Sequence, residues 1–506
     1  MTAVIIESGA IEGISTGNGV VEYRGVPYGK APTGDLRFRA PQPVTPWQGT
    51  RVMDKYGVPA WQEVNPLLGI NAVGEDCLHV NLWVPEGQGP FPVMVWLHGG
   101  GFSNGSASQR LYHGAELARA AQAIVVNVNY RLGAWGFGHF QHQAPHVPQE
   151  SNLALRDILA ALRWVQRNIE AFKGDANCVT LFGESAGGFA VATLMAVPQA
   201  QGLFHRAIVQ SGAADMVLSP EAAVEVGSLV YSALQEQLGD HKDILLNAGA
   251  KEMVRAQRAA LKVPVPRGLR NTTPQYGMPF LPVVDGDLLP MSPVQALKEG
   301  KAHSVPLLAG TCQEEWNLFQ YVPAFNGGVE MAALRELDRD AIQRRFVRVL
   351  PEHGEAALNL YEDLVTPHPQ RAITDYFTAM ESDRLFRIPT HRLLTAHAQA
   401  GGDAWGFEFT WDENGMGLPL GAFHVMDVPL VFATTHTPMG KMFTSGSQAA
   451  KLLSEQVVAI WGEFVRTGTA HWTPWPSGKV LQLGHTLEES TYIDQQRLAL
   501  WETIIP

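Results

Sequence analysis

The stretch CVTLFGESAGGFAVATLMAV, residues 178–197, joins two apolar runs through a serine that is flanked by glycines. The first run, CVTLF, is typical of a buried β-strand, and the second predicts a helix that begins directly after Ser185. Gly183 and Gly187 form the pattern Gly-x-Ser-x-Gly, which permits the tight turn of a nucleophile elbow. The stretch therefore predicts an α/β sheet and makes Ser185 the candidate nucleophile.

The same five-residue pattern occurs around Ser15 and Ser103. Because the chain contains 50 glycines, the pattern alone is weak evidence, and its context has to decide. Ser103 follows the strand candidate FPVMVWL but precedes the polar run NGSASQRLYHG, so we interpret it as a loop hydroxyl that hydrogen-bonds locally. Ser15 lies between strand candidates, in an expected turn. Ser185 alone stands between a strand and a helix.

Strand and helix candidates alternate along most of the chain. AVIIES, AIEGIS and GVVEYRGVPYG near the N-terminus predict antiparallel strands at one edge. LHVNLWV, FPVMVWL and AIVVNVNY have the composition of buried, mostly parallel strands. VPLLAG and AWGFEFTW are later strand candidates, and AAKLLSEQVVAIWGEFVRTG is an amphipathic helix candidate that ends at Gly468. We therefore predict an α/β-hydrolase fold, a central and mostly parallel sheet flanked by helices.

The domain organisation follows from length and composition. A chain of 506 residues could hold about three domains, but large α/β enzymes also form single units. Residues 220–260 are helix-like and charged, and a proline-rich stretch follows them. We expect one domain over residues 1–506, with inserted helical lobes at about 220–280 and 320–400.

Charge and hydropathy exclude several classes of partner. The net charge is −12 without a basic stripe, which argues against binding to nucleic acid. The N-terminus lacks the charged and apolar regions of a signal peptide, and no apolar run approaches the roughly 20 residues that span a bilayer. We expect a cytoplasmic protein with no membrane association, monomeric by default although an oligomer remains open.

Cysteine spacing and cofactor motifs give no sign of a bound group. Cys77, Cys178 and Cys312 are too far apart for a disulfide framework or a zinc site, so we expect three buried thiols. The chain has no HExxH motif, P-loop or dinucleotide-binding fingerprint. We therefore expect no metal and no cofactor.

The sequence HGGG at residues 98–101 directly follows FPVMVWL. Attack of a serine on an ester carbonyl creates an oxyanion, and each fixed N–H donor aimed at it contributes on the order of 3 kcal/mol. Glycines suit such a loop because no side chain obstructs the backbone. We expect the donors to be the amides of Gly100, Gly101 and Ala186.

A serine nucleophile also needs a histidine base and a carboxylate that orients the histidine. In this fold class they follow the serine in the order acid, then histidine. Eight histidines follow residue 315, so spacing alone leaves the choice of base open. Glu315 comes just after the strand candidate VPLLAG, where open α/β sheets place their sites. We interpret Glu314 as a solvated or supporting acid.

Several long motifs occur in order and resemble the type-B carboxylesterases, a family that includes bacterial p-nitrobenzyl esterases and cholinesterases. The motifs are EDCLHVNLW (75–83), HGGGF (98–102), NYRLGAWGF (129–137) and GESAGG (183–188). The resemblance extends from the N-terminal hairpins to HWTPWP near the C-terminus, over essentially the whole chain.

The resemblance implies roles for further residues. GTCQEEWNLF (310–319) is similar to the family's acid loop, which makes Glu315 the triad acid. GAFHVMDVPLVF (421–432) is similar to its histidine loop, which makes His424 the base, with a strand-like run after it. Glu184 and Ser211 would have supporting roles. Phe102, Trp135 and Phe137 are candidates to line the substrate gorge, with ordinary core packing as the alternative, since aromatic residues after strands are more often core.

Two positions depart from the family pattern. Ala60 stands where the family usually has a cysteine that pairs with the one matching Cys77, so Cys77 should be unpaired, as a reducing compartment allows. Trp316 replaces the glycine that commonly follows the triad glutamate, so the backbone of the acid loop is expected to differ.

Together the residues and the resemblance predict a cofactor-free serine carboxylesterase that acts on small-molecule esters. His424 would deprotonate Ser185, an acyl-enzyme would form, and water would hydrolyse it. A carbamate or amide hydrolase with the same triad is the first alternative. A non-catalytic, cholinesterase-like binding protein is the second, although such proteins typically lack an intact triad.

Overall fold

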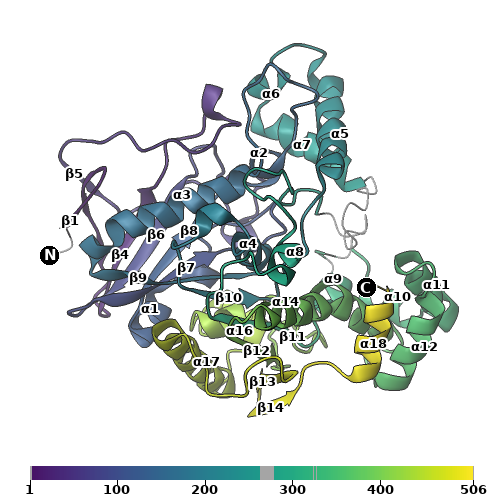
Figure 1. Ribbon diagram of the computed structural model, residues 1–506. Helices are drawn as coiled ribbons and strands as arrows, with labels where there is room; N and C mark the ends of the chain where they lie inside the picture. Colours follow the sequence, from purple (N-terminus) through teal and green to yellow (C-terminus); the bar gives the residue numbers. More distant parts are fainter. Residues whose placement is uncertain (1–2, 263–277, 323, 326–327, 505–506) are drawn as a thin grey trace.

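The computed structural model describes residues 3–262, 278–322, 324–325 and 328–504. Its centre is a large twisted sheet with helices on both sides (Figure 1). In order across the sheet the strands are β14 (Leu487–Thr491), β13 (Lys479–Leu483), β12 (Ala404–Phe409), β11 (Leu307–Cys312), β10 (Arg206–Gln210), β9 (Gly174–Glu184), β7 (Phe91–Leu97), β8 (Ile124–Val128), β6 (His79–Pro85), β4 (Val20–Pro27) and β3 (Ile14–Ser15).

Strand directions show a parallel centre with antiparallel ends. All neighbours from β8 across to β13 run parallel, whereas β14, β6, β4 and β3 pair antiparallel with their neighbours. A separate small sheet contains β1 (Ala3–Ile6), β2 (Gly9–Glu12) and β5 (Thr50–Val52). This arrangement is the α/β-hydrolase fold that the sequence predicts.

Two local expectations about the N-terminal half are wrong. LHVNLWV forms β6, which is buried as expected but antiparallel to both neighbours. An apolar run reports burial on both faces and carries no information on strand direction. Ser15 lies in the short strand β3 and not in a turn, because Ser15 pairs with Val21 of β4.

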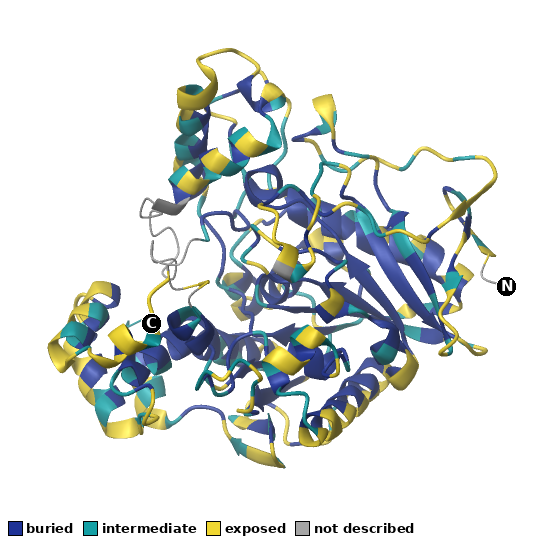
Figure 2. Ribbon diagram, turned by 180° about the vertical axis from the view of Figure 1, so that it is seen from behind, coloured by how far each residue is buried: buried dark blue, intermediate teal, exposed yellow. Residues whose placement is uncertain are grey.

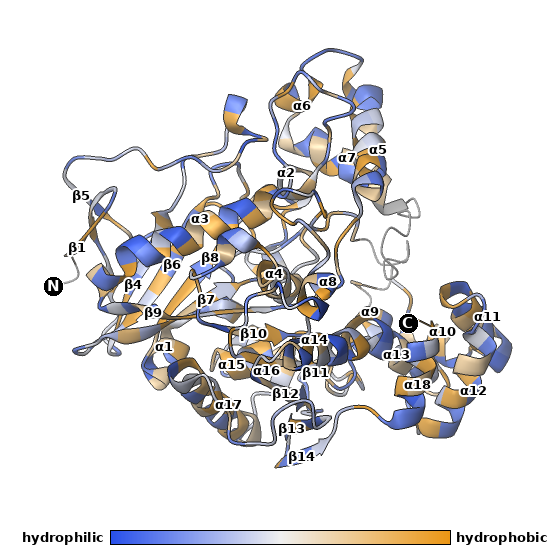
Figure 3. Cartoon of the chain, viewed as in Figure 1, coloured by the Kyte–Doolittle hydropathy of each residue, from blue (hydrophilic) through white to orange (hydrophobic). Residues whose placement is uncertain are grey.

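Side chains that alternate along the strands separate the core into two layers. Along β7, Val93, Val95 and Leu97 join one hydrophobic cluster, and Met94 and Trp96 join the other. Figure 2 shows these inner strands as buried, and Figure 3 shows hydrophobic residues concentrated along them. The first layer is covered by α3 (Leu153–Asn168), α4 (Ala186–Leu194) and α14 (Ile388–Gln399), the second by α1 (Ala115–Ala121), α15 (Val428–Val431) and α17 (Gln448–Thr467).

The helix α17 has the boundaries that its sequence predicts. The Ser447 hydroxyl caps its first turn by accepting the Ala450 N–H at 3.2 Å, and Gly468 ends it with a φ of 72°. Serine at this position satisfies a free amide, and glycine adopts the left-handed conformation without a Cβ penalty.

The two segments expected as lobes are largely helical where the structure describes them. The first contains α5 (Pro220–Leu238), α6 (Ile244–Asn247) and α7 (Ala250–Lys262), and residues 263–277 lie outside the described residues. The second contains α9 (Asn317–Tyr321), α10 (Met331–Arg335), α11 (Arg339–Val349), α12 (Gly354–Leu364), α13 (Thr374–Ser382) and α14. Helices α11, α12 and α13 share a third hydrophobic cluster with Trp501 of α18 (Gln495–Ile504). The short helices α2 (Gly133–Phe137), α8 (Pro293–Lys298) and α16 (Pro438–Thr444) complete the set.

All three cysteines are free, including Cys77. Cys77 and Cys312 are buried as expected, but Cys178 is only half-buried. Cys178 lies in β9, and Arg206 Nη1 donates a hydrogen bond to its Sγ at 3.3 Å. In the described part of the chain, no helix combines the length and apolar character that crossing a bilayer requires.

Candidate active site

Ser185 lies at the sharp turn between β9 and α4, with φ 55° and ψ −125°. A non-glycine residue in this conformation is strained, and such strain is concentrated at functional sites. Two backbone bonds hold the turn: the Ser185 N–H donates to Gln210 O at 3.0 Å, and the Phe189 N–H donates to Ser185 O at 2.8 Å. A Cβ at Gly187 would lie 1.9 Å from Leu97 O, so the close approach of α4 to β7 requires glycine. The elbow that the glycine pattern predicts is therefore present.

The HGGG loop lies directly beside this serine. A Cβ on Gly99 would come within 3.1 Å of Ser185 Cβ, which measures how closely the loop backbone approaches the elbow. Gly100 and Gly101 have φ values of 111° and 60°, and a Cβ on Gly100 would lie 2.2 Å from Asn104 O. Backbone conformation thus favours glycine at both positions, and at Gly100 the lack of space requires it as well.

Three amides at this junction have no hydrogen-bond acceptor among the residues that the structure describes. Within the described part of the chain, the N–H groups of Gly100, Gly101 and Ala186 donate no hydrogen bond. Ala186 is the first residue of α4, where the helix geometry leaves amides unsatisfied. These donors are available to a negatively charged oxygen next to Ser185.

The buried side chain of His98 packs at the start of the HGGG loop. His98 stacks on Tyr130 with ring centroids 4.6 Å apart, and the Tyr130 hydroxyl donates to His98 O at 2.6 Å. His98 Nδ1 lies 2.8 Å from Gly99 O. Burial lowers the pKa of His98 to about 4, so the ring is neutral and acts as a packed support.

Phe102, which follows the glycines, lies inside the protein, and the next residue, Ser103, is half-buried. Phe102 is fully buried and packs against Phe137 at a centroid distance of 4.8 Å. The Ser103 N–H donates to Gly100 O, but the buried Ser103 hydroxyl has no hydrogen-bond partner among the described residues. Among the described residues, the expected local hydrogen bond of this hydroxyl is therefore absent.

Glu315 and His424 meet on the same side of the sheet as Ser185. His424 Nδ1 lies 2.6 Å from Glu315 Oε2, and Glu315 Oε1 accepts the Cys312 N–H at 2.8 Å. Both side chains are buried. A carboxylate on Nδ1 fixes the imidazole tautomer so that Nε2 is the basic nitrogen.

The run after His424 is a helix, contrary to the strand-like expectation. VPLV forms α15, with Pro429 in its first turn. Proline is favoured at the start of a helix because its φ suits the helix and its missing N–H has no partner there. A four-residue apolar run does not distinguish a buried strand from a buried helical turn.

The second nitrogen of His424 faces Glu184. Nε2 lies 3.2 Å from Glu184 Oε1, whereas Ser185 Oγ makes no hydrogen bond to any described residue. Catalytic hydrogen bonds are often long without substrate and tighten in the substrate complex. Glu184 thus lies beside the ring nitrogen that does not contact Glu315.

Burial and charge control the protonation of this pair. Burial raises the pKa of Glu184 to about 8, opposed by His424 and aided by Asp427 and Glu315. Burial lowers the pKa of His424, but the charges of Glu184 and Glu315 outweigh this effect and raise it to about 9. Carboxylates therefore face both ring nitrogens of the buried imidazole, an arrangement that favours its protonated form.

Sequence reasoning missed several residues around His424. Asp427 is buried, accepts a hydrogen bond from Gln210 at 2.6 Å, and has its pKa raised to about 6 mainly by burial. Phe319 and Phe386 pack on the imidazole at centroid distances of 5.2 and 4.9 Å. Asp427 and Phe319 lie inside the motifs quoted for the histidine loop and the acid loop, so only Phe386 is outside both.

Ser211 lies next to this region, with φ 49° and its N–H bonded to Gly310 O at 2.8 Å. Its buried hydroxyl has no hydrogen-bond partner among the described residues. The described residues also include no group of three or more His, Cys, Asp or Glu side chains arranged to hold a metal ion.

Comparisons with known proteins match nearly the whole chain. The carboxylesterase family model matches residues 1–501. The para-nitrobenzyl esterase of Bacillus subtilis is 32% identical over 476 residues, covering 92% of this chain and 90% of the relative. The mouse cholinesterase is 29% identical, over 92% of this chain and 78% of that protein. A solved carboxylesterase from Geobacillus stearothermophilus superposes with a TM-score of 0.83 at 29% identity, over 99% of this chain and 100% of the other. The chain therefore belongs to the carboxylesterase family.

Proposed function

We propose that Ser185, His424 and Glu315 are the catalytic triad of this carboxylic ester hydrolase. The observation that carries the proposal is the strained Ser185 elbow beside the HGGG loop, with the buried His424–Glu315 contact of 2.6 Å nearby. The family membership supports the same reaction class.

The proposed reaction begins when substrate excludes water from the elbow and His424 Nε2 turns from Glu184 to the serine hydroxyl. Nε2 accepts the proton as Ser185 Oγ attacks the ester carbonyl, and Glu315 stabilises the imidazolium through Nδ1. The imidazolium then protonates the leaving alcohol. Water activated by the same nitrogen attacks the acyl-enzyme, and the acid is released.

The tetrahedral intermediates carry a negative oxygen that needs fixed donors. The amides of Gly100, Gly101 and Ala186 are proposed to supply them, because no described residue already accepts from these groups. Donors that are fixed in advance avoid the cost of reorganising solvent during the reaction.

The bond that is cleaved can be tested with matched substrates. We expect kcat/KM on a p-nitrophenyl ester to exceed that on the corresponding carbamate and anilide, because an ester carbonyl is the more electrophilic and its alcohol leaves more readily. Higher kcat/KM on the carbamate or anilide would instead favour the carbamate or amide hydrolase.

The Glu184–His424 contact predicts a pH effect. Glu184→Gln removes the strongest charge that raises the pKa of His424, so this pKa falls. His424 must be neutral to act as a base, so the rising limb of kcat/KM should move from about pH 9 to lower pH in the variant. The measurement is the pH profile of kcat/KM from pH 5 to 10.

Glu455→Gln is a suitable control, because Glu455 is exposed on α17 and makes only a 4.0 Å ion pair with Lys451. Its profile should match the wild type. An unchanged rising limb in Glu184→Gln would show that Glu184 does not set the pKa of the base.

We also propose that the enzyme works in the cytoplasm as a monomer on small-molecule esters, without a nucleic-acid or membrane partner. The free state of all three cysteines supports this proposal, since a reducing compartment keeps thiols unpaired. The negative net charge of −12 also disfavours nucleic acid.

A further inference from the structure

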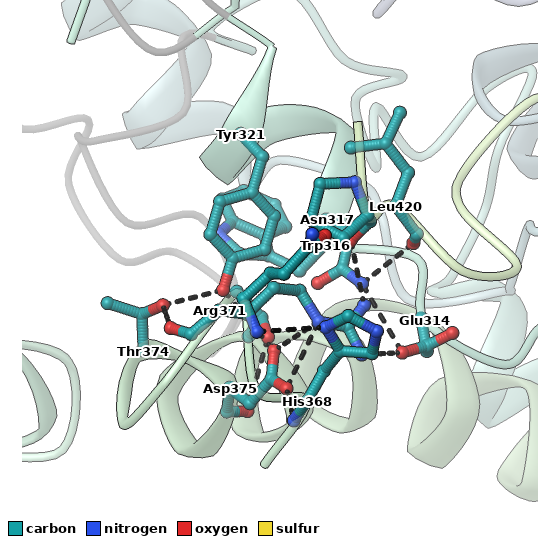
Figure 4. A network of polar contacts seen from close by, with 12 residues as sticks. Glu314, Trp316, Asn317, Tyr321, His368, Arg371, Thr374, Asp375 and Leu420 are labelled. Atoms are coloured by element: carbon teal, nitrogen blue, oxygen red, sulfur yellow. Dashed lines mark hydrogen bonds and ion pairs between the residues drawn. The ribbon is translucent and has the colours of Figure 1, made fainter. Parts of the chain in front are cut away.

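A network of polar contacts surrounds Glu314 and Arg371 (Figure 4). Glu314, the residue before Glu315, accepts a hydrogen bond from Arg371 Nη2 at 2.5 Å. Arg371 Nε in turn lies 2.8 Å from Asp375 Oδ1. The Arg371 side chain is only 8% exposed and that of Glu314 is 28% exposed, so the Glu314–Arg371 pair is largely withdrawn from solvent.

Glu314 also binds the histidine loop through two bonds. The Ala422 N–H donates to Glu314 Oε2 at 3.0 Å, and the Glu314 N–H donates to Ala422 O at 2.8 Å. Gly421 has a φ of 59°, and a Cβ there would lie 1.6 Å from Glu314 Oε2. Glycine at this position lets the carboxylate reach the backbone two residues before His424.

Two further hydrogen bonds link the acid loop and Arg371 to the residues just before the histidine loop. Asn317 Nδ2 donates to Leu420 O at 2.8 Å, and Arg371 Nη1 donates to Pro419 O at 3.3 Å. The acid loop and Arg371 therefore both bind the backbone of residues 419–422. Figure 4 shows Glu314, Asn317 and Arg371 around Leu420.

The other end of the network is anchored as well. Asp375 Oδ2 accepts the His368 N–H at 2.6 Å, and the Tyr321 hydroxyl contacts both Thr374 Oγ1 at 2.6 Å and Asp375 Oδ1 at 3.3 Å. Arg371 therefore has little freedom to move, since its ion-pair partner Asp375 is itself held by a backbone amide and a buried tyrosine.

We propose that Glu314 and Arg371 are positioning residues that hold the histidine loop at the distance from the acid loop where Glu315 can bond His424. The proposal rests on the proposed triad. Neither residue touches the reacting atoms, so both act through Ala422 and its neighbours. A displacement of about 1 Å in such a site can cost about 100-fold in rate, whereas an exposed ion pair contributes little even to stability.

The test uses Glu314→Gln, Arg371→Gln and the double variant, with active sites counted from the burst of p-nitrophenol. A glutamine at position 314 can still accept the Ala422 N–H, so the loss of kcat in Glu314→Gln measures the effect of losing the ion pair with Arg371. We expect kcat per titrated site to fall about 10- to 100-fold in each single variant, with KM within about twofold of the wild type. The kcat of the double variant should be no lower than that of the less active single variant, because both substitutions remove the same ion pair.

Two further variants complete the design. Glu362→Gln removes an exposed ion pair with Arg339 in the same helical region and should leave kcat per site unchanged. Arg371→Lys keeps the charge but loses the fork of donors, so its kcat per site should lie between those of the wild type and Arg371→Gln.

The outcomes are distinguishable. In one outcome, Glu314→Gln lowers only the number of active sites or the Tm and keeps the wild-type kcat per site. That result would overturn the positioning role and show that Glu314 only stabilises the fold. Multiplicative losses in the double variant would also overturn it. If Glu314→Gln does not fold, wild-type kcat per site in Arg371→Lys and Arg371→Gln would contradict the proposal. Full activity of Ser185→Ala in the same assay would instead reject the triad.

Discussion

Ser185→Ala should lower kcat for p-nitrophenyl ester hydrolysis by about 10⁶-fold while the protein stays folded. The hydroxyl is the proposed attacking group, and its loss leaves only the binding and oxyanion contributions to rate. Alanine removes a single oxygen from a half-buried position, so the elbow backbone should persist. The measurement is kcat, together with the circular dichroism spectrum and Tm.

Ser103→Ala is the matched control, because Ser103 also lies in a Gly-x-Ser-x-Gly pattern and follows a strand of the same sheet. It should keep wild-type kcat. A folded but inactive Ser103→Ala protein, or an active Ser185→Ala protein, would contradict the assignment of the nucleophile.

Glu315→Gln should lower kcat by about 10⁴-fold. The amide keeps the shape of the side chain and can still accept the Cys312 N–H, but it cannot stabilise the imidazolium, and its NH₂ group favours the wrong tautomer of His424. Glu315 Oε2 lies 2.6 Å from His424 Nδ1, so the substitution removes the charge that contacts the imidazole. The measurement is kcat at the pH optimum of each protein.

Glu336→Gln, at the exposed end of α10, serves as the control for removal of a glutamate charge and should retain full activity. Turnover of Glu315→Gln within tenfold of the wild type would show that another carboxylate orients the histidine.

Local sequence signals predicted the elbow and the HGGG loop because their requirements are local. Gly100 is required by Asn104 O, four residues away in the same turn, so the glycine pattern itself carries the information. Gly187 is the exception, because the atom it must accommodate is Leu97 O on the neighbouring strand β7. The acid and the base are different, since Glu315 and His424 are 109 residues apart. Only the resemblance to a family selected them.

Other features depend on tertiary contacts that no local pattern records. The approach of Glu184 to His424 Nε2 joins a strand end to a distant loop. The strands β10, β13 and β14 are only five residues long, too short for a periodic signal to stand out. The predictions of a strand-like run at VPLV and of a buried Cys178 were wrong, because a short apolar run fits more than one environment.

The most direct test of the account is covalent labelling with a fluorophosphonate, which captures the nucleophile of a serine hydrolase. After digestion, mass spectrometry should place one phosphonyl group on Ser185 in the wild type and in Ser103→Ala, and none on Ser185→Ala. A phosphonyl group on Ser103, or an enzyme that hydrolyses esters at full rate without any adduct on Ser185, would contradict it.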